Sequence, residues 1–497
     1  MVAGFLLQCW WVWRYTMDDA FISFRYAKHI ADGIGPVWNL ADRARPVEGF
    51  TSFLHVWLLG ARHYVMGGDL VVTGKVLGVV ASLVLAGSVT HEVVRRGLGS
   101  WGALVALSFL VLPFTALNSV SGMETSLFLL WNWLCAITCV RLLETPGVGL
   151  TWRFVLFGLL GTLTRPEFVP AFGLMAAYVW WRRPAVRPAL TLALAVLYVL
   201  PGVAVTTWRY AYYGDVVPNA FYVKQTKRLS WWGMIYVARF VGFLALPYAL
   251  LVLAGWRGLW AAHRELLVVV GINVGIAVGY FTTTVPLMGW WYRFLLPQLP
   301  LLAVCAAVAV STRGRPEARR LVGWRAAALA ALVLSTAAHV PLIARFLVAH
   351  EAHEARYREV GKRLRPFAAT DRWLVYHDVG SLVYEAEWNT VDVVGLNTRL
   401  SELKLTCEMR TDLVMTFGRS GPPAAGPCPS LYVAIADLPF SREERVHDSY
   451  MRVFVRQDVA YASELKRALL DGWPEPLARP FDWLAWYSQR FQSVFFQ

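Results

Sequence analysis

Charged residues are scarce in this chain. Only 16% of its 497 residues are Asp, Glu, Lys or Arg, whereas 57% are hydrophobic, and the mean hydropathy is +0.46. These values together lie well outside the range of an ordinary soluble domain. Membrane-spanning strands would give short alternating patterns, but this chain has long apolar runs such as Leu70–Thr90, Ala189–Trp208 and Pro247–Trp260. We therefore predict an α-helical polytopic membrane protein.

The sequence also lacks the signatures of nucleotide use. It contains no glycine-rich phosphate-binding loop, no Walker pattern and no soluble Rossmann unit with a DxD pattern. The net charge of +14 is high enough for a nucleic-acid-binding protein, but the basic residues lie mainly in short loops between apolar runs, where they set membrane orientation. We therefore expect no nucleic-acid partner, and any activated donor would have to reach the protein through the membrane, as a lipid phosphate does.

Cysteine is rare as well, with six residues in the chain. Cys407 and Cys428 are the only pair in the polar C-terminal part. The other four lie in or beside apolar runs: Cys9, Cys135, Cys139 and Cys305. A compartment outside the cytoplasm would oxidise the polar pair, so we predict a Cys407–Cys428 disulfide. The alternative is two free thiols.

Eleven apolar runs are candidates for membrane-spanning helices. The first, Val2–Trp13, is short for a span, but no small-residue cleavage site follows it, so we expect it to remain as the first helix. We do not count Thr51–Met66, because His55, Arg62 and His63 interrupt it and favour a helix along the membrane surface. The eleven spans are predicted near residues 2–13, 70–90, 101–117, 126–143, 153–163, 168–181, 189–210, 234–255, 266–283, 294–311 and 323–343.

The loop charges predict the orientation of these helices. If the N-terminus is cytoplasmic, the loops near residues 91–100, 141–153, 182–187, 256–264 and 312–325 lie inside, and they are rich in Lys and Arg, as the positive-inside rule requires. Acidic residues gather in the opposite loops: Asp18, Asp19, Asp32, Asp42, Glu48, Asp69, Glu124, Glu167 and Asp215. We therefore expect a multi-pass protein of the plasma membrane whose active face is extracytoplasmic.

The C-terminal third of the chain differs in composition. From about Arg345 to Gln497 the hydropathy drops, and short β-like runs such as Trp373–Tyr376 and Thr390–Val394 stand between turn residues. We predict two domains: a transmembrane domain at 1–344, with its first outer loop at 14–69, and an extracytoplasmic soluble α/β domain at 345–497.

Two adjacent carboxylates, Asp18 and Asp19, follow the first apolar run directly. The pattern predicts a short amphipathic helix that starts here and ends before Gly33, with Arg25 and His29 on one of its stripes. One Asp could be a helix N-cap, but a cap does not explain a neighbour pointing about 100° away on the same turn. At the mouth of a membrane cavity such a carboxylate could act as general base toward a sugar hydroxyl. Both are therefore candidate catalytic residues, and because helical geometry points only one of them into the cavity, we favour Asp19.

Other outer loops also place charges beside Gly, Pro or hydroxyl residues. They are the stretches RPVEGFT with Glu48, SGMET with Glu124, and TRPE with Arg165 and Glu167. Charges at the rim of a membrane are costly and usually line a polar cavity. Arg165 and Glu167 could instead pair only with one another and staple their loop.

Cations near the membrane on the outer side oppose the positive-inside bias. The stretch YYGDVVPNAFYVKQTKR holds Tyr213, Asp215, Asn219 and Lys224, and the stretch GWWYRF holds Tyr292 and Arg293. A phosphate at the lipid headgroup level would explain the cations, since Arg and Lys bind phosphate through charge-assisted hydrogen bonds. The alternative is snorkelling to lipid headgroups. Tyr and Trp rings in these stretches could stack on sugar faces.

With these residues, the sequence resembles the GT-C class of polyprenyl-phosphate-sugar glycosyltransferases, and within it the terminal arabinofuranosyltransferase family of cell-wall arabinan synthesis. The resemblance rests on motifs in the family's order over most of the chain: DDAFISFRYAKHIADGIGPVWN, RPVEGFTSFLHVW, SGMETSLF, LTRPEF, YYGDVVPNAF, YRFLLP and VDVVGLN. This chain is shorter than the arabinan-capping members, and its soluble domain matches only around VDVVGLN at Val391–Asn397, so the resemblance leaves the acceptor open.

The resemblance implies a first outer loop that holds the catalytic aspartate, Asp18 or Asp19, and a membrane cavity for a polyprenyl-phosphate-sugar donor. Our hypothesis is therefore a membrane glycosyltransferase that transfers a sugar, with arabinofuranose as the candidate, to a glycan or other acceptor outside the cell. The sequence predicts no metal ligands and leaves a divalent metal undecided. Candidate substrate-binding residues are Arg25, His29, Glu48, Glu124, Arg165, Glu167, Tyr213, Asp215, Asn219, Lys224, Tyr292 and Arg293.

The stereochemical course is open at this stage. In-line displacement of a polyprenyl phosphate by a base-activated hydroxyl inverts the anomeric carbon, whereas the arabinan-capping relatives form a β linkage from a β donor. Asp18 and Asp19 could therefore divide the roles of base and oxocarbenium stabiliser. A transporter or flippase of a lipid-linked saccharide is the alternative function, but such proteins tend to show internal repeats, and this sequence has none. A scaffold or polymer ligase is a third, weaker alternative.

Overall fold

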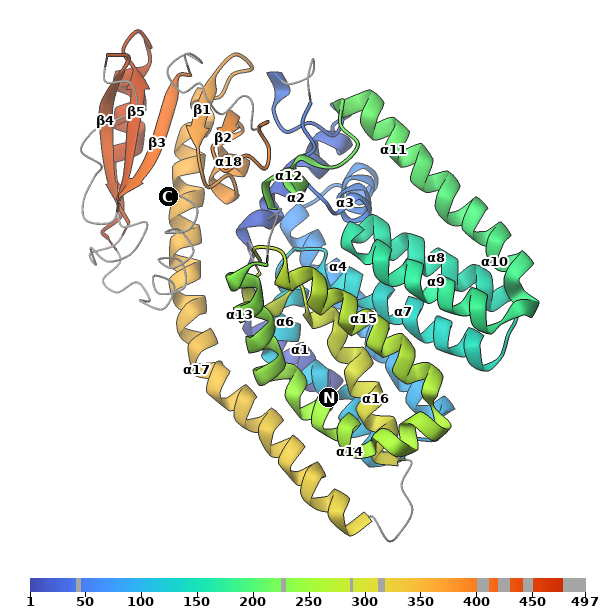
Figure 1. The fold of residues 1–497 in the computed structure, drawn as a ribbon. Helices are drawn as coiled ribbons and strands as arrows, with labels where there is room; N and C mark the ends of the chain where they lie inside the picture. The colour runs from blue at the N-terminus through green and yellow to red at the C-terminus, as the bar shows by residue number, and fades with distance from the viewer. Residues whose placement is uncertain are drawn as a thin grey trace.

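A computed structural model of the chain describes residues 1–41, 46–224, 229–286, 289–311, 318–399, 411–418, 430–440 and 450–476. Figure 1 shows a bundle of helices with a small sheet beside one end, and a long helix, α17 (Ala318–Leu364), that runs along the bundle and ends against the sheet. The predicted fold class, a helical membrane protein with a C-terminal α/β part, is confirmed.

Six helical stretches in the described residues are long and apolar enough to cross a membrane, and a seventh is formed if a bent pair counts as one span. The six are α4 (Leu70–Arg95), α7 (Thr125–Glu144), α10–α11 (Pro184–Tyr213), α13–α14 (Trp231–Ala262), α15 (Arg264–Thr282) and η7–α16 (Trp290–Ser311). The pair, α5–η2 (Ser100–Val111) and α6 (Pro113–Val120), is bent by 49°, and Pro113 stands at the first helical position after the bend. Shorter helices are α1 (Val2–Trp11), α8 (Val148–Thr164) and α9 (Val169–Arg182). The count of eleven spans stays a prediction.

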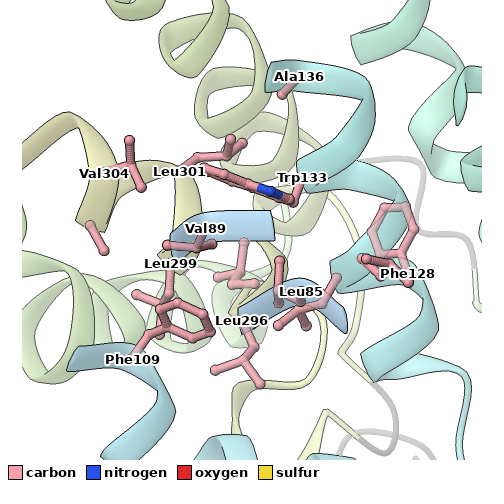
Figure 2. Packing of buried hydrophobic residues seen from close by; sticks show 14 of the residues in the cluster. Leu85, Val89, Phe109, Phe128, Trp133, Ala136, Leu296, Leu299, Leu301 and Val304 are labelled. Atoms are coloured by element: carbon pink, nitrogen blue, oxygen red, sulfur yellow. The ribbon is translucent and has the colours of Figure 1, made fainter. Parts of the chain in front are cut away.

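The core of the bundle lies where α4, α7 and α16 (Leu299–Ser311) meet, as Figure 2 shows. Trp133 on α7 is fully buried there, with Leu85 and Val89 of α4 and Leu299 of α16 close by. Small residues let the helices approach closely, as is usual in membranes. A Cβ atom added to Gly78 of α4 would lie 2.1 Å from the Ser119 carbonyl oxygen of α6. The core thus fixes the ends of the helices that carry the outer loops.

The predicted first outer loop contributes two helices at the end of the bundle that faces the C-terminal part (Figure 1): α2 (Asp18–Ala31) and α3 (Phe53–Met66). Both segments are helical, as predicted, and the position of α3 along the membrane surface stays a prediction. The N-cap of α2 is Met17, whose side chain accepts no capping hydrogen bond, and Asp18 and Asp19 stand in the first turn. The N-cap alternative for one of the aspartates is therefore wrong. The carboxylates still stabilise the positive end of the helix dipole.

The C-terminal part holds a five-stranded sheet in the order β2-β1-β3-β5-β4. Strand β1 (Trp373–Tyr376) pairs in parallel with β2 (Asn389–Asp392) and β3 (Leu413–Gly418), whereas β5 (Tyr450–Arg456) is antiparallel to β3 and β4 (Tyr432–Pro439). The short helix α18 (Ser381–Ala386) connects β1 to β2 and packs on α17, and α19 (Ala462–Leu470) packs on β4.

The predicted strand at Trp373–Tyr376 is confirmed, and the one predicted at Thr390–Val394 is shifted, because the chain leaves the sheet after Asp392. The predicted domain boundary at residues 344 and 345 lies inside α17, so the helix that ends the bundle also begins the C-terminal part. Cys407 and Cys428, the predicted disulfide, lie outside the described residues. The other four cysteines are buried free thiols.

Candidate active site

The two carboxylates at the start of α2 have different surroundings. The Asp18 Oδ1 atom accepts a hydrogen bond from the Ser381 backbone N–H at 2.9 Å. Asp18 also shares a side-chain hydrogen bond with Asp378, in which one of the two carboxyl groups must carry the proton. Asp19 instead acts electrostatically on the Tyr15 hydroxyl. Asp18 therefore contacts the C-terminal part directly, whereas Asp19 is linked to the loop before α2 through electrostatics.

A third carboxyl group, that of Glu354 on the outer end of α17, lies near Asp18. Burial raises the pKa of Asp18, against the lowering effect of its hydrogen bonds to Asp378 and Ser381. Burial and the negative charge of Asp18 raise the pKa of Glu354. Among the described residues no cation lies within 4 Å of the carboxylate of Asp18, Asp19 or Glu354. Perturbed carboxyl groups of this kind are typical of functional sites.

A buried ion-pair network lies beside this group. The Arg165 guanidinium bonds to Glu124 at 2.5 Å and to Glu167 at 2.5 Å. It also stacks over the Phe294 ring, with 4.7 Å from Cζ to the ring centroid. Arg165 and Glu167 do pair within their loop, as the loop-staple alternative states. Arg165 also bonds to Glu124, however, and so connects this loop to the one before α7.

Arg293 reaches the same network from the GWWYRF turn. Its side chain is 3% exposed, donates from Nη1 to the Met17 sulfur at 2.9 Å, and lies over Phe294. Its Nε atom has no hydrogen-bond partner. The two residues that precede Arg293, Trp291 and Tyr292, have φ angles of 55° and 58°. Non-glycine residues in this region cost about 1–3 kcal/mol each and gather at functional sites.

Electrostatics links these residues into one cluster. Burial opposes ionisation of Glu124, but the guanidinium groups of Arg165 and Arg293 hold its pKa at about 2. Arg293 and Asp19 both act on the Tyr15 hydroxyl, with opposite effects on its ionisation. The structure therefore brings together six of the predicted site residues, and Tyr292 sits in the turn that carries Arg293. The six are Asp18, Asp19, Glu124, Arg165, Glu167 and Arg293.

Four side chains of this site were missed in the sequence. His55 on α3 is 1% exposed, neither ring nitrogen has a hydrogen-bond partner, and Glu124 acts on it electrostatically. Lys75 of α4 donates to the Trp13 and Tyr15 carbonyls at 2.5 and 2.8 Å. Glu354 and Asp378 are more than 330 residues from Asp18 along the chain. A histidine and a lysine inside apolar runs were the available signal for the first two, whereas no local pattern marks the others.

Other predicted site residues hold the first outer loop to its surroundings. Glu48 is buried and bonds to Arg209 at 2.5 and 3.1 Å. The Tyr213 hydroxyl donates to the Pro36 carbonyl at 2.8 Å. His29 bonds through Nδ1 to the Val37 carbonyl at 2.7 Å. These hydrogen bonds and ion pairs account for Glu48, Tyr213 and His29 as structural residues, without requiring a role in substrate binding.

A further set joins the outer loops to the C-terminal part. The three nitrogens of Arg25 donate to the carbonyls of Trp38, Val383 and Trp388 at 2.8, 3.0 and 2.7 Å. The Asn219 amide approaches the carbonyls of Gly395, Leu396 and Thr398 at 2.7, 3.1 and 3.0 Å.

The loop that Asn219 binds is itself held by Asp392, which accepts the backbone N–H groups of Val394, Gly395 and Asn397. The VDVVGLN motif is therefore a docking turn. Asp215 lies half-exposed, 3.6 Å from Arg399. The side chain of Lys224 lies outside the described part. Among described residues no group of three or more His, Cys, Asp or Glu side chains is arranged to hold a metal ion.

Comparison with known proteins supports the sequence resemblance. The terminal β-(1→2)-arabinofuranosyltransferase of Corynebacterium glutamicum is 24% identical over 373 residues, which cover 68% of this chain and 53% of that protein. The terminal β-(1→2)-arabinofuranosyltransferase of Mycobacterium tuberculosis is 30% identical over 266 residues, which cover 48% and 39%. The chain thus spans about half or less of these curated relatives. No family model matches it.

Two solved structures share the fold. ArnT from Cupriavidus metallidurans bound to undecaprenyl phosphate has a TM-score of 0.56 and 14% identity, and the match covers 93% of this chain and 98% of ArnT. The apo state of the same protein gives 0.53 and 15% over the same shares. The match extends over almost all of both chains, so this protein is a multi-pass membrane protein with the GT-C fold. The predicted likeness to terminal arabinofuranosyltransferases is confirmed.

Proposed function

We propose that this chain is a membrane glycosyltransferase that moves a sugar from a polyprenyl-phosphate donor to a glycan acceptor. The observation that carries the proposal is one site in which two carboxylates, Asp18 and Asp19, lie beside a buried cationic cluster that contains Arg293. Neither carboxylate has an ion-pair partner in the part of the chain that the structure describes. Sequence likeness to arabinofuranosyltransferases and the fold of ArnT support this reaction class.

The proposed chemistry divides the site between acceptor and leaving group. A carboxylate, Asp18 or Asp19, accepts the proton of an acceptor hydroxyl as its oxygen attacks the anomeric carbon. The bond between that carbon and the donor phosphate breaks, and the phosphate leaves with the electron pair. Arg293, whose Nε is unpaired inside the protein, binds the phosphate oxygens and stabilises the negative charge that develops on them.

The raised pKa of Asp18 favours it as the proton acceptor, because a base works best when its pKa approaches the working pH. Asp19 acts on Tyr15, as Arg293 does, and its negative charge would stabilise an oxocarbenium-like centre. This division replaces the preference for Asp19 as the base, which rests on helical geometry alone. It lets two carboxylates on one helical turn perform two roles.

The finer identity of the reaction is part of the proposal. The names of the two curated relatives favour arabinofuranose as the sugar and a β-(1→2) linkage as the product. ArnT was solved with undecaprenyl phosphate bound, which supports a polyprenyl carrier. The acidic outer loops and the basic loops at the other end favour an active site and C-terminal part on the extracytoplasmic face. The comparisons give no support to the transporter or flippase alternative.

Two measurements test this function. Mass spectrometry of lipid that copurifies with the protein should find a polyprenyl-phosphate sugar. The purified protein should then transfer that sugar to an oligosaccharide acceptor in detergent. Translocation of the lipid across a proteoliposome bilayer without any glycan product would instead establish the transporter alternative.

A further inference from the structure

The segment that precedes α18 in the C-terminal part lies directly against the candidate catalytic Asp18. Ser381, the first residue of α18, donates its backbone N–H to Asp18 Oδ1 at 2.9 Å. The residue before it, Gly380, lies flat on the carboxyl group: a Cβ atom there would be 1.8 to 1.9 Å from Oδ2, Cγ and Oδ1 of Asp18. No side chain fits at residue 380 unless the Asp18 carboxyl group moves away.

Lack of space restricts this position to glycine as long as the Asp18 carboxyl group stays where it is. The φ angle of Gly380 is −83°, outside the left-handed region that favours glycine. Its neighbour in the contact is a carboxyl group on another part of the chain, 362 positions earlier. The contact therefore depends on the position of the Asp18 side chain.

The C-terminal segment is held in place by several contacts beyond this one. Arg25, two turns along α2, binds the carbonyls of Val383 and Trp388 on either side of the α18 C-terminus. Asn39 exchanges two hydrogen bonds with the backbone of Thr390, at 3.1 and 2.7 Å. Buried contacts of this kind hold α2 and α18 as one unit, so the Ser381 N–H is a fixed donor.

We propose that the C-terminal part completes the catalytic centre, with the Gly380–Ser381 segment positioning the Asp18 carboxyl group. This inference rests on the proposed function, because it gives Asp18 a role in the reaction. The Ser381 N–H group holds the Asp18 carboxylate in one orientation. Gly380 lies against the carboxylate and has no side chain that would displace it. Gly380 and Ser381 are therefore positioning residues.

A hydrogen-bond donor also affects when Asp18 ionises. The N–H bond stabilises the carboxylate and so lowers its pKa, and its loss raises the pKa. The titratable groups that face Asp18 are Asp19 on α2, Asp378 before α18 and Glu354 on α17. Lys75 and Arg358 act on Glu354 and reach Asp18 only through it. None of these groups is altered by removal of the Ser381 N–H.

A matched pair of variants isolates this N–H group. Ser381→Pro removes the donor, and proline is well tolerated at the first position of a helix, where its missing N–H belongs to no helical hydrogen bond. Ser381→Ala keeps the N–H and removes only the hydroxyl. In the purified full chain, we expect Ser381→Pro to lower kcat at least about 10-fold with little change in donor KM, and to shift the acid limb of the kcat–pH profile upward. Ser381→Ala loses the hydroxyl, which also acts on Asp18 and Glu354, so the contribution of the N–H is the amount by which the shift in Ser381→Pro exceeds that in Ser381→Ala.

A second variant tests the space. Gly380→Ala should displace the Asp18 carboxyl group and reproduce the upward shift of the acid limb. Gly49→Ala is its control, because a Cβ at Gly49 meets the Asn397 side chain at 1.8 Å, in the same junction but away from Asp18. Gly49→Ala should leave the acid limb unmoved. A wild-type profile in both Ser381→Pro and Gly380→Ala would overturn the inference.

A thermal-unfolding cycle tests the contact without any activity assay. Asp18→Ala, which removes the acceptor oxygens, and Ser381→Pro should be non-additive if the two groups are bonded, and additive if they are not. Additive effects would overturn the inference. Non-additive unfolding together with full transferase activity of Asp18→Asn and Asp19→Asn would instead refute the proposed function and, with it, the role of the contact in catalysis.

Discussion

The two ends of α7 bury charge in opposite ways. At its last residue, Glu144 joins Glu92 of α4 in a closed network in which Arg95, Arg96 and Arg141 bind the Glu92 carboxylate at 2.5 to 2.6 Å. Glu144 in turn binds Arg95 and Arg96 at 2.9 Å. Both negative charges of this network, the buried Glu92 and the more exposed Glu144, therefore have more than one cation.

At the other end the polar groups are not balanced in this way. Glu124 precedes α7 and is paired with Arg165, but Asp18, Asp19 and Glu354 have no ion-pair partner among the described residues. Both nitrogens of His55 and the Nε of Arg293 are buried and unpaired. Because a buried polar group without a partner costs about 1–3 kcal/mol, a chain retains such groups where something else uses them. The balanced end is structural, and the unbalanced end is the candidate active site.

The sharpest way to break this comparison is to remove charge from the balanced end. Glu92→Gln leaves three arginines near a neutral side chain, so we expect a loss of about 3–5 kcal/mol in the free energy of unfolding, measured by denaturation in detergent. Glu144→Gln is the control, since this side chain is 28% exposed and should cost less. A Glu92→Gln protein that is fully stable but lacks activity would contradict this comparison, because it would place a functional residue at the end that we describe as structural.

At the unbalanced end the effect should fall on turnover. Asp18→Asn and Asp19→Asn should insert and unfold like the wild type but lose at least about 10²-fold in kcat, since Asn cannot take up a proton or carry negative charge. Asp32→Asn on the same helix is the control, because Asp32 is half-exposed and pairs with Lys28. Near-native turnover of synthetic polyprenyl-phosphate sugar by both Asn variants would remove the catalytic role.

Arg293 sharpens the division between donor binding and anchoring. Loss of a charge-assisted contact costs about 1.5–3 kcal/mol, so Arg293→Ala should raise the apparent donor constant roughly 10- to 150-fold. The control is Arg14→Ala. Arg14 lies before α2 and forms an exposed ion pair with Glu351. The donor constant is measured by steady-state kinetics. An unchanged value in Arg293→Ala would show that Arg293 binds lipid headgroups and not the donor phosphate.

The smallest effect concerns stability and pH. Burial, with help from the charge of Arg25, lowers the pKa of His29 from 6.5 to about 4. The unfolded chain then binds the proton more tightly than the folded chain, so stability is complete above pH 6.5 and is lost as the pH falls from 6.5 toward 4. Between pH 7.5 and 6 the loss due to this residue should be about 0.8 kcal/mol. His29→Gln should reduce the pH slope of thermal unfolding, and an unchanged slope would contradict the shifted pKa.

Local signals in the sequence determined much of this protein. The long apolar runs predicted a helical membrane protein, the pattern after Asp18 predicted α2, and Trp373–Tyr376 was recognised as a strand. These features depend on neighbours a few residues apart, because hydrophobic burial and helix or strand periodicity act over that range. The motif that carries Asp18 and Asp19 was visible for the same reason.

Only the tertiary structure decided which groups share a site. Glu48, Arg25 and Asn219 looked like binding residues by type and position, but each is occupied by contacts that hold the loops together. Glu354 and the Gly380–Ser381 segment had no local signature, yet they lie against Asp18. The physical reason is that the groups which share a buried polar cluster are set by distance in space, not by distance along the chain. Glu354 on α17 comes near Asp18 on α2 only in the packed fold.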